Sequence, residues 1–220
     1  MVSITVSQQD SVETRADGHG RLRRSALWYP DVPPPLVSLN EDFFIPLQSY
    51  TWGYRPLFWT RFGGPGGSYL SHLTKVTASW AGGLLRMDFS FDREVPDECR
   101  RFGRHEDSEN ERVIEFLVDG PGGEVIDQVE VWQQYPSERE YVVAWSRQKG
   151  KLACLKVSTN RGRMCEFGRK PNSRSKPVIQ RKVSAPQGMA ITGVFGAQVC
   201  IIWPRPFATA TKANYFLMSG

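Results

Sequence analysis

The sequence has little that would place the protein in or beyond a membrane. It contains no run near the ~20 apolar residues that a membrane-spanning helix needs. Its polar start lacks the charged and then apolar layout of a secretion signal, and it has no Asn-x-Ser/Thr acceptor site. The cysteines include no C-x-x-C pair, which favours free thiols; they are Cys99, Cys154, Cys165 and Cys200. These absences predict a cytoplasmic protein with no membrane partner.

Residues typical of metal or cofactor chemistry are also scarce. The three histidines, His19, His72 and His105, have no second ligand at metal-binding spacing. The run from Gly64 to Tyr69 approaches a dinucleotide-binding fingerprint, but Tyr69 replaces the final glycine and no helical pattern follows. We therefore expect no metal and no organic cofactor.

The composition is that of a folded domain with a modest positive charge. The 220 residues include 28 basic and 23 acidic side chains, which give a net charge of +5, and they are 40% hydrophobic and 12% aromatic. This apolar content is enough for a packed core, and the length fits one large domain, or one domain with an arm. A surplus of five charges does not by itself indicate nucleic-acid binding.

Alternation of apolar and polar residues predicts an all-β fold. Segments with β-branched and aromatic residues at every second position are typical of strands that bury one face. No segment of ten or more residues has a convincing helical stripe. The predicted strands cover residues 84–91, 112–118, 125–132, 141–145 and 152–158.

Proline, aromatic and polar content divides the chain into four segments. Residues 1–26 are polar, contain three clustered arginines and are expected to form a mobile basic arm. Residues 27–56 have four prolines within residues 28–36, continue with many aromatic residues and are expected to be an extension that packs on the domain. The domain itself is placed at residues 57–206, and residues 207–220 form a C-terminal tail.

A basic run occupies residues 161–182, with eight basic residues against one acidic residue, Glu166. Such a run is typical of a solvated loop, and contact with RNA or another anion is the alternative. The run lacks the repeated aromatic residues that stack on bases, so we do not expect nucleic acid as a partner.

An internal repeat is the most informative feature. The glycine turn of residues 64–67, Gly-Pro-Gly-Gly, recurs at residues 120–123, and a degenerate copy ends at Gly188. Apolar residues stand three and six positions after the last glycine of each copy. This spacing is not a strand period, so it predicts a bulge between two inward residues. Three such units around a pseudo-threefold axis would form a prism of three antiparallel sheets. The apolar pairs are Leu70 and Leu73, Ile126 and Val129, and Ile191 and Val194.

Four segments also carry a family resemblance: FGGPGG (62–67), VDGPGGEVIDQVEV (118–131), LKVSTNRGRMCEFG (155–168) and ITGVFG (191–196). In this order they resemble segments of the jacalin-related lectins, whose fold is β-prism I, with three Greek-key sheets. The resemblance covers about residues 57–204. It implies a non-catalytic, lectin-like module whose partner is a glycan or a protein surface, and it also allows a homodimer.

In that family the sugar lies between the first glycine loop and a loop of the last unit that supplies an aspartate. A carboxylate and nearby backbone N–H groups suit the paired hydroxyls of a sugar. Cys200 stands at the position where the resemblance implies the aspartate, and a thiol accepts hydrogen bonds poorly, so we expect a divergent sugar site. The ligand-binding residues that the resemblance implies are Gly66, Gly67 and Ser68 in the first loop and Gly196, Ala197 and Gln198 in the last loop.

Two further groups of residues have two interpretations each. Asp119 and Glu124 flank the second glycine turn, with Gly122 and Gly123 between them, either as turn chemistry in which Asp119 bonds its own backbone, or as ligand contacts. The aromatic residues before the first loop either complete the core or form a pocket wall for a sugar ring or another small molecule. These aromatic residues are Trp52, Tyr54 and Trp59.

An enzyme is the alternative function. It would use a pocket between the aromatic extension and the prism, and would act on a small organic substrate by general acid–base chemistry. The sequence offers no recognisable nucleophile–base pair, so catalysis stays second to binding, and a protein-interaction domain is a further alternative. The residues of such an enzyme would be His72, Asp119, Glu124 and Arg55.

Overall fold

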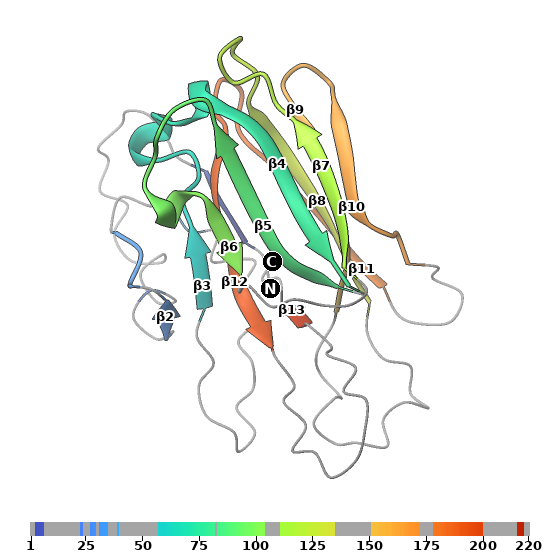
Figure 1. The fold of residues 1–220 in the computed structure, drawn as a ribbon. Coiled ribbons are helices and arrows are strands. Elements are labelled where there is room, and N and C mark those ends of the chain that lie inside the picture. The colour runs from blue at the N-terminus through green and yellow to red at the C-terminus, as the bar shows by residue number, and fades with distance from the viewer. Residues whose placement is uncertain are drawn as a thin grey trace, which may run out of the picture.

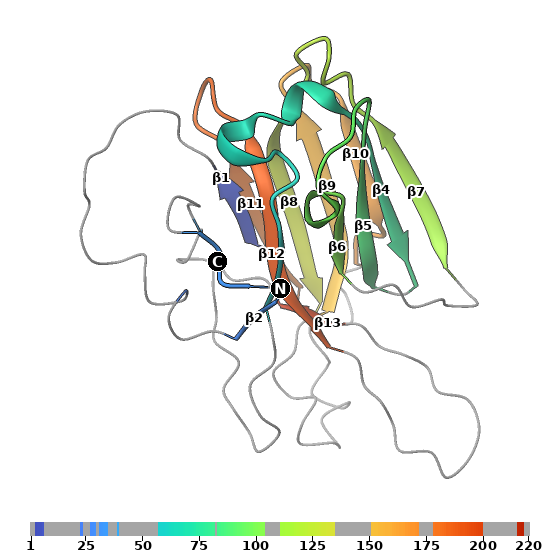
Figure 2. The same ribbon diagram turned by 60° about the vertical axis from the view of Figure 1, so that its left-hand side comes forward.

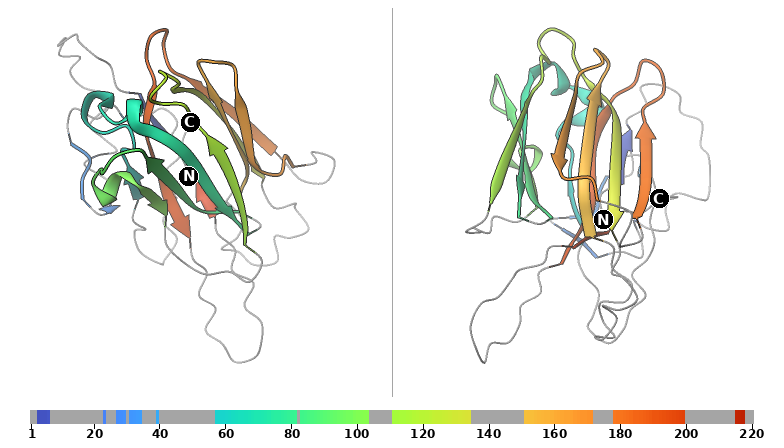
Figure 3. Two further views of the ribbon diagram at one scale, coloured as in Figure 1. Left: turned by 45° about the horizontal axis from the view of Figure 1, so that its top comes forward. Right: turned by 90° about the vertical axis from the view of Figure 1, so that its right-hand side faces the viewer.

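The computed structural model describes residues 3–6, 23, 27–29, 31–34, 39, 57–81, 83–103, 111–134, 151–171, 178–199 and 215–217. The elements in these ranges are strands, with short 3-10 helices at Pro65–Gly67, Leu70–His72 and Asp97–Cys99. The strands form three sheets that face one another around a common interior, as the two views of Figure 3 show. The predicted all-β prism is therefore confirmed. The predicted strand at residues 141–145 lies outside the described residues.

The first sheet has the order β6-β5-β4-β7 and is antiparallel throughout (Figure 1). Three consecutive strands lie side by side and the fourth returns beside the first of them, which is a Greek key. The strands are β4 (Leu73–Trp80), β5 (Leu84–Phe91), β6 (Arg101–Gly103) and β7 (Arg112–Leu117).

The second sheet repeats this order as β10-β9-β8-β11, again antiparallel. Strand β8 is equivalent to β4 of the first sheet. Each of these two strands pairs on one side with the next strand of the chain and on the other side with the fourth strand of its unit. The strands are β8 (Ile126–Gln134), β9 (Lys151–Thr159), β10 (Met164–Gly168) and β11 (Val178–Ser184).

The third sheet joins the two ends of the chain. Its order is β1-β12-β3-β2, and β13 also pairs with β12. The central strand β12 lies between β1 and β3 in the way that β4 lies between β5 and β7, but β2 departs from the Greek key by pairing with β3 in parallel. The strands are β1 (Ser3–Val6), β2 (Trp28–Tyr29), β3 (Leu57–Thr60), β12 (Ile191–Val199) and β13 (Tyr215–Leu217).

The chain termini differ from the expected segments. Ser3–Val6, within the predicted mobile arm, pair with Phe195–Ile191 as an edge strand, so these four residues are not part of an arm. Tyr215–Leu217, within the predicted tail, pair with Val199–Ala197. In both cases unpaired backbone groups at the edges of the third sheet are satisfied by a distant part of the chain.

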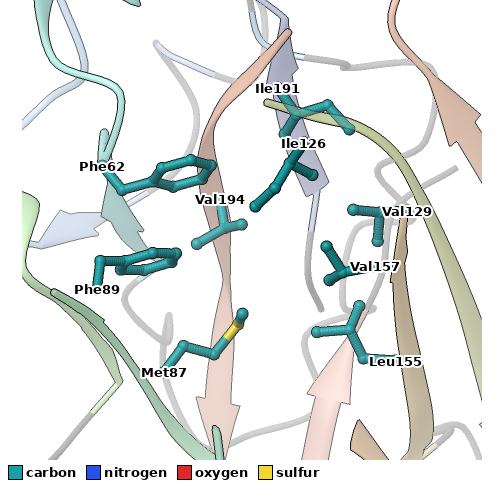
Figure 4. A pocket seen from close by; sticks show the side chains of 9 residues that line it. All are labelled: Phe62, Met87, Phe89, Ile126, Val129, Leu155, Val157, Ile191 and Val194. Atoms are coloured by element: carbon teal, nitrogen blue, oxygen red, sulfur yellow. The ribbon is translucent and has the colours of Figure 1, made fainter. Parts of the chain in front are cut away.

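The core lies between the three sheets and draws apolar side chains from each of them. Figure 4 shows Phe62, Met87 and Val194 among nine side chains that point toward one another at the centre. They enclose a void of about 10 Å³, which has room for about one water molecule at most. The centre of the prism is thus filled by packing and is not a ligand pocket.

A bulge occurs at the same place in all three units, and in the second and third units it lies between the predicted apolar pair. The register shifts by one residue after Leu73 in β4, after Ile126 in β8 and after Ile191 in β12. Each shift leaves one extra residue near the start of a central strand. The first inward residue of β4 is Leu73, whereas Leu70 belongs to the preceding 3-10 turn, so Val76 takes the place of Val129 and Val194. The three extra residues are Thr74, Asp127 and Thr192.

The backbone around each bulge is equivalent as well. The carbonyl of each extra residue accepts a hydrogen bond from the chain that leaves the flanking strand of its own sheet. Val118 N–H donates to Thr74 at 2.8 Å, and Ala185 N–H donates to Asp127 at 2.7 Å. Gly63 N–H likewise donates to Thr192 at 2.8 Å. The three glycine turns are therefore placed by the same contact in every sheet.

Candidate functional site

The three glycine turns gather at one end of the prism. Figure 2 shows them at the top of the view, where the turn before β4, the turn before β8 and the turn before β12 lie close together. This follows from the repeat, because each turn precedes a central strand and all three central strands start at this end. We call this surface the glycine-loop end.

The first turn is built from glycines that other residues could not replace without strain. Gly64, Gly66 and Gly67 all have positive φ values, of 70°, 58° and 80°. A Cβ atom on Gly64 would lie 2.4 Å from the ring of Tyr69, which packs edge-on against Phe91 with ring centroids 6.4 Å apart. Gly66 is exposed and has no other atom within 4 Å of the position of a Cβ, so its backbone is open to a ligand.

A cleft of about 520 Å³ opens at this end, between the first and third turns and the start of β8. Its wall combines glycine backbone, amide and hydroxyl groups, apolar side chains and one carboxylate. The first unit contributes Gly66, Gly67 and Leu70; the second contributes Val125, Asp127 and Asn160; the third contributes residues 185–190 and Thr192. The cleft has both polar and apolar surface, which suits a small polar ligand with one apolar face.

The second glycine turn is held by its own carboxylates. Gly122 N–H donates to Oδ1 of Asp119 at 3.0 Å, which is the turn chemistry that the sequence allowed. Oδ2 of Asp119 lies 2.7 Å from Nη1 of Arg161, and this hydrogen bond, with a smaller contribution from Gly122, holds the pKa of Asp119 below its usual range.

Glu124 has a structural environment as well, and it is completely buried. Its Oε1 accepts from the hydroxyl of Thr159 at 2.7 Å, and its Oε2 accepts from the backbone N–H of Asp119 at 2.8 Å and from Nη1 of Arg163 at 2.9 Å. Both candidate carboxylates of the second turn therefore hold the loop in place. Gly123 is exposed and lies beside them at the turn.

His72 lies just after the first turn and is engaged at both ring nitrogens. Nδ1 is 2.8 Å from Oδ1 of Asp92, and Nε2 is 3.2 Å from Nη1 of Arg93. With the proton on Nδ1 donated to the carboxylate, Nε2 accepts from the guanidinium. The imidazole thus has no free nitrogen to take a proton from a substrate.

Of the predicted aromatic site residues, the structure describes Trp59, which does not line the cleft. Trp59 lies in β3, where its Nε1–H donates to the carbonyl of Asp31 at 2.7 Å. It packs on a small second cluster formed by Trp28, Leu39, Leu57 and Phe195. Trp52, Tyr54 and Arg55, the other candidates of that segment, lie outside the described residues, as does Cys200.

The expected loop that begins at Gly196 is wrong, because β12 continues through Val199. Gly196 pairs with Phe58 and Ala197 with Leu57, so the ladder to β3 keeps these residues extended. At about 3.3 Å per residue they lie more than ~10 Å along the strand from Thr192, which borders the first turn. The structure therefore does not bring Gly196, Ala197 and Gln198 to Gly66, Gly67 and Ser68.

Of the six basic residues of the run that the structure describes, three bind carboxylates. Arg161 and Arg163 bind the two carboxylates of the second turn, and Lys170 binds Glu166 and lies 4.8 Å from the centroid of the Trp132 ring. Residues 172–177 of the run lie outside the described part. The paired charges agree with a structural role for this part of the run.

The site residues that sequence reasoning missed are Asp127, Asn160, Gln187, Met189 and Thr192. Asp127 and Thr192 stand at the predicted bulges, between the two apolar residues of the repeat, which is the signal that could have found them. No comparable pattern identifies Asn160, Gln187 or Met189.

Within the described ranges, no group of three His, Cys, Asp or Glu residues could hold a metal ion. None of their helices has the length and apolar character to cross a membrane.

Comparisons with known proteins find likeness in solved structures alone. No protein-family description matches the chain, and no curated protein does. Frutapin, a lectin from Artocarpus incisa, is 13% identical with a TM-score of 0.39, and the match covers 67% of this chain and 83% of frutapin. The prostate-specific WGA16 glycoprotein lectin is 14% identical with a TM-score of 0.43, over 78% of this chain and 96% of that chain. A mannose-specific jacalin-related lectin from Morus nigra is 12% identical with a TM-score of 0.37, over 67% and 80%. All three are lectins, and the Morus nigra protein is a jacalin-related one, the family that the sequence motifs resemble.

Proposed function

We propose that the protein is a non-catalytic glycan-binding module and that its site is the cleft at the glycine-loop end. The observation that carries the proposal is the cleft itself, which is open, about 520 Å³ in volume and walled by all three repeat units. A volume of this size is within the range of small-molecule sites. Between β3 and the described part of the aromatic extension, Trp28 and Leu39 pack with Leu57 and Phe195 in a buried cluster.

The wall has the groups that a pyranose requires. Sugar hydroxyls both donate and accept hydrogen bonds, so they need acceptors such as a carboxylate together with amide groups. Asp127 and Gln187 offer these groups, and Gly66 lets a ring approach the backbone closely. The CH groups on one face of a sugar ring pack on apolar side chains, which Leu70 and Met189 supply.

The residues considered as general acids or bases are engaged in hydrogen bonds within the fold, which favours a binding function over catalysis. A general acid or base must be free to exchange a proton with the substrate. Asp119, Glu124 and His72 are each held by two or more hydrogen bonds within the fold. Of the four candidates, Arg55 alone lies outside the described residues.

Calorimetric titration with methyl mannosides and galactosides, together with a glycan array, tests the proposal. We expect at least one neutral sugar to bind at millimolar or lower concentration. In ¹⁵N NMR spectra, the same sugar should shift the amide signals of Gly66, Gly67 and Gly188. Absence of binding to every glycan at millimolar concentration would refute the function. Shifts that centre on Gly196 and Gln198 would move the site to the position that the family resemblance implies.

A further inference from the structure

Asp127 differs from Asp119 and Glu124 because its carboxylate has no partner in the part of the chain that the structure describes. Asp119 and Glu124 each bind an arginine and a backbone N–H. Asp127 lines the cleft, is half-buried, and makes no side-chain hydrogen bond or ion pair among the described residues. Its backbone carbonyl is used, because it accepts from Ala185 at 2.7 Å. The fold therefore fixes the backbone of this residue and leaves the carboxylate available.

The bulge explains how a polar residue comes to be there. Ile126 and Val129 both face the core, and an ordinary strand cannot point residues three apart to the same side. The extra residue at the bulge allows Ile126 and Val129 to face the same side, and the bulge also changes the direction of its own side chain. Gln128 returns to the outer face, where it donates to Glu130 at 3.0 Å. Asp127 is left at the mouth of the prism.

The equivalent residues of the other two units do not offer a carboxylate to the cleft. Thr74 is the extra residue of β4, but its hydroxyl donates to the carbonyl of Ser90 at 3.1 Å and it does not line the cleft. Thr192 lines the cleft, but it is 2% exposed and has no charge. The pseudo-threefold end thus has one chemically distinct side, at the second unit.

The neighbours of Asp127 leave its charge uncompensated. Asn160 lines the same wall, but its amide is already used: Oδ1 accepts from Val125 N–H at 3.1 Å and Nδ2 donates to the carbonyl of Gly123 at 3.1 Å. The described residues that line the cleft include no Lys, Arg or His. An acidic ligand would therefore meet a carboxylate without a cation nearby, whereas paired hydroxyls or an amino group would supply the donors that the carboxylate lacks.

Building on the proposed glycan function, we propose that Asp127 is the anchoring carboxylate of the cleft, which selects neutral and amino sugars and rejects acidic ones. The carboxylate accepts hydrogen bonds from two adjacent hydroxyls of the ring, and the open backbone at Gly66 and the amide of Gln187 lie on the other walls of the cleft. Charge, and not shape alone, then decides between sugars of equal size.

Asp127→Asn tests the assignment, since it keeps the shape of the side chain and removes the charge. The matched control is Asp97→Asn, which removes the same charge from a side chain that is fully exposed outside the cleft. Because no described residue binds the Asp127 carboxylate, D127N should unfold at the same urea concentration as the wild type. Titration with the best-binding methyl glycoside should show at least ~10-fold weaker binding for D127N. The affinity of D97N should stay within about twofold of the wild type.

The outcomes separate the two proposals. If the wild type binds a neutral glycan and D127N binds it within about twofold, the anchoring role is refuted and the glycan function stands. If the wild type prefers N-acetylneuraminic acid or sulfated sugars to neutral ones, the charge selection is refuted. If the wild type binds no glycan, the proposed function fails and this assignment fails with it. A ¹⁵N shift of the wild-type Asp127 amide on adding the glycoside gives a readout that does not depend on any variant.

Discussion

Nη1 of Arg163 lies 2.9 Å from Oε2 of Glu124, although the arginine is 46% exposed and the glutamate is completely buried. The same arginine donates through Nη2 to the carbonyl of Leu117 at 2.6 Å, and its guanidinium carbon lies 5.4 Å from the centroid of the Phe116 ring. One side chain thus joins the end of β7 to the second glycine turn. A buried carboxylate depends strongly on such a partner, because it has lost its water.

Arg163→Met should therefore destabilise the protein much more than Arg161→Met. Both arginines follow β9, both are about half exposed and both bind a carboxylate of the same turn. R163M leaves the buried Glu124 without its counter-charge and should cost about 2–3 kcal/mol of unfolding free energy. R161M leaves an exposed Asp119 in water and should cost far less. Urea unfolding followed by tryptophan fluorescence measures both, and equal midpoints would contradict the structural role of Glu124.

Gly120→Ala should be more destabilising than Gly123→Ala, although both glycines belong to one turn. A Cβ on Gly120 would lie 2.3 Å from the carbonyl oxygen of Leu70 and 2.5 Å from that of Leu73, and rigid backbone cannot move aside. We expect a loss of about 3 kcal/mol. Gly123 has a φ of 84° and no other atom within 4 Å, so its substitution costs about 1 kcal/mol of backbone strain. Thermal unfolding of the two variants measures the difference, and the reverse order would show that the turns do not approach one another this closely.

The stability of the second turn should fall below about pH 4. The Arg161 guanidinium and the Gly122 N–H lower the pKa of Asp119 from its ordinary value of 3.8. A carboxyl whose pKa is lower in the folded state contributes stability above its unfolded pKa and loses it as the pH falls through the folded pKa.

Arg161→Met removes the largest cause of this shift. The pKa of Asp119 should then rise toward 3.8. Carboxyl ¹³C titration by NMR measures it in both proteins. An unchanged pKa in R161M would mean that the turn backbone alone holds the charged form.

The described cysteines should resist alkylation in the folded protein. Burial raises the pKa of the Cys154 thiol to about 11, and burial raises the pKa of Cys99 and Cys165 as well. The thiolate is the reactive form, so at pH 8 each of these residues should react with iodoacetamide at least ~10-fold more slowly than in urea. Mass spectrometry of the peptides measures each site separately. Rapid labelling of Cys154 in the native protein would show that β9 opens locally.

The prediction of the fold from sequence succeeded where the repeat constrained the backbone. Each glycine turn appears in the structure before a central strand, and the spacing of three correctly indicated a bulge between the apolar pair in the second and third units. In the first unit the bulge lies one step later, between Leu73 and Val76. The prediction failed where pairing partners are remote. Gly196 resembled the start of a loop, but pairing with Phe58 holds it in β12. Ser3–Val6 resembled a free arm, but the open edge of β12 takes them as a strand.

By itself, the sequence determined the all-β class, the threefold plan and the turns, because local spacing and glycine conformations decide these. The tertiary structure decided which polar residues near those turns stabilise the fold and which remain available to a ligand. Glu124 and Asp127 are both acidic and three residues apart, and no local pattern distinguishes them. They differ because β9 and its following turn bring Thr159 and Arg163 to the first, whereas the cleft opens beside the second. Burial and partners depend on residues distant in the chain, which folding alone brings together.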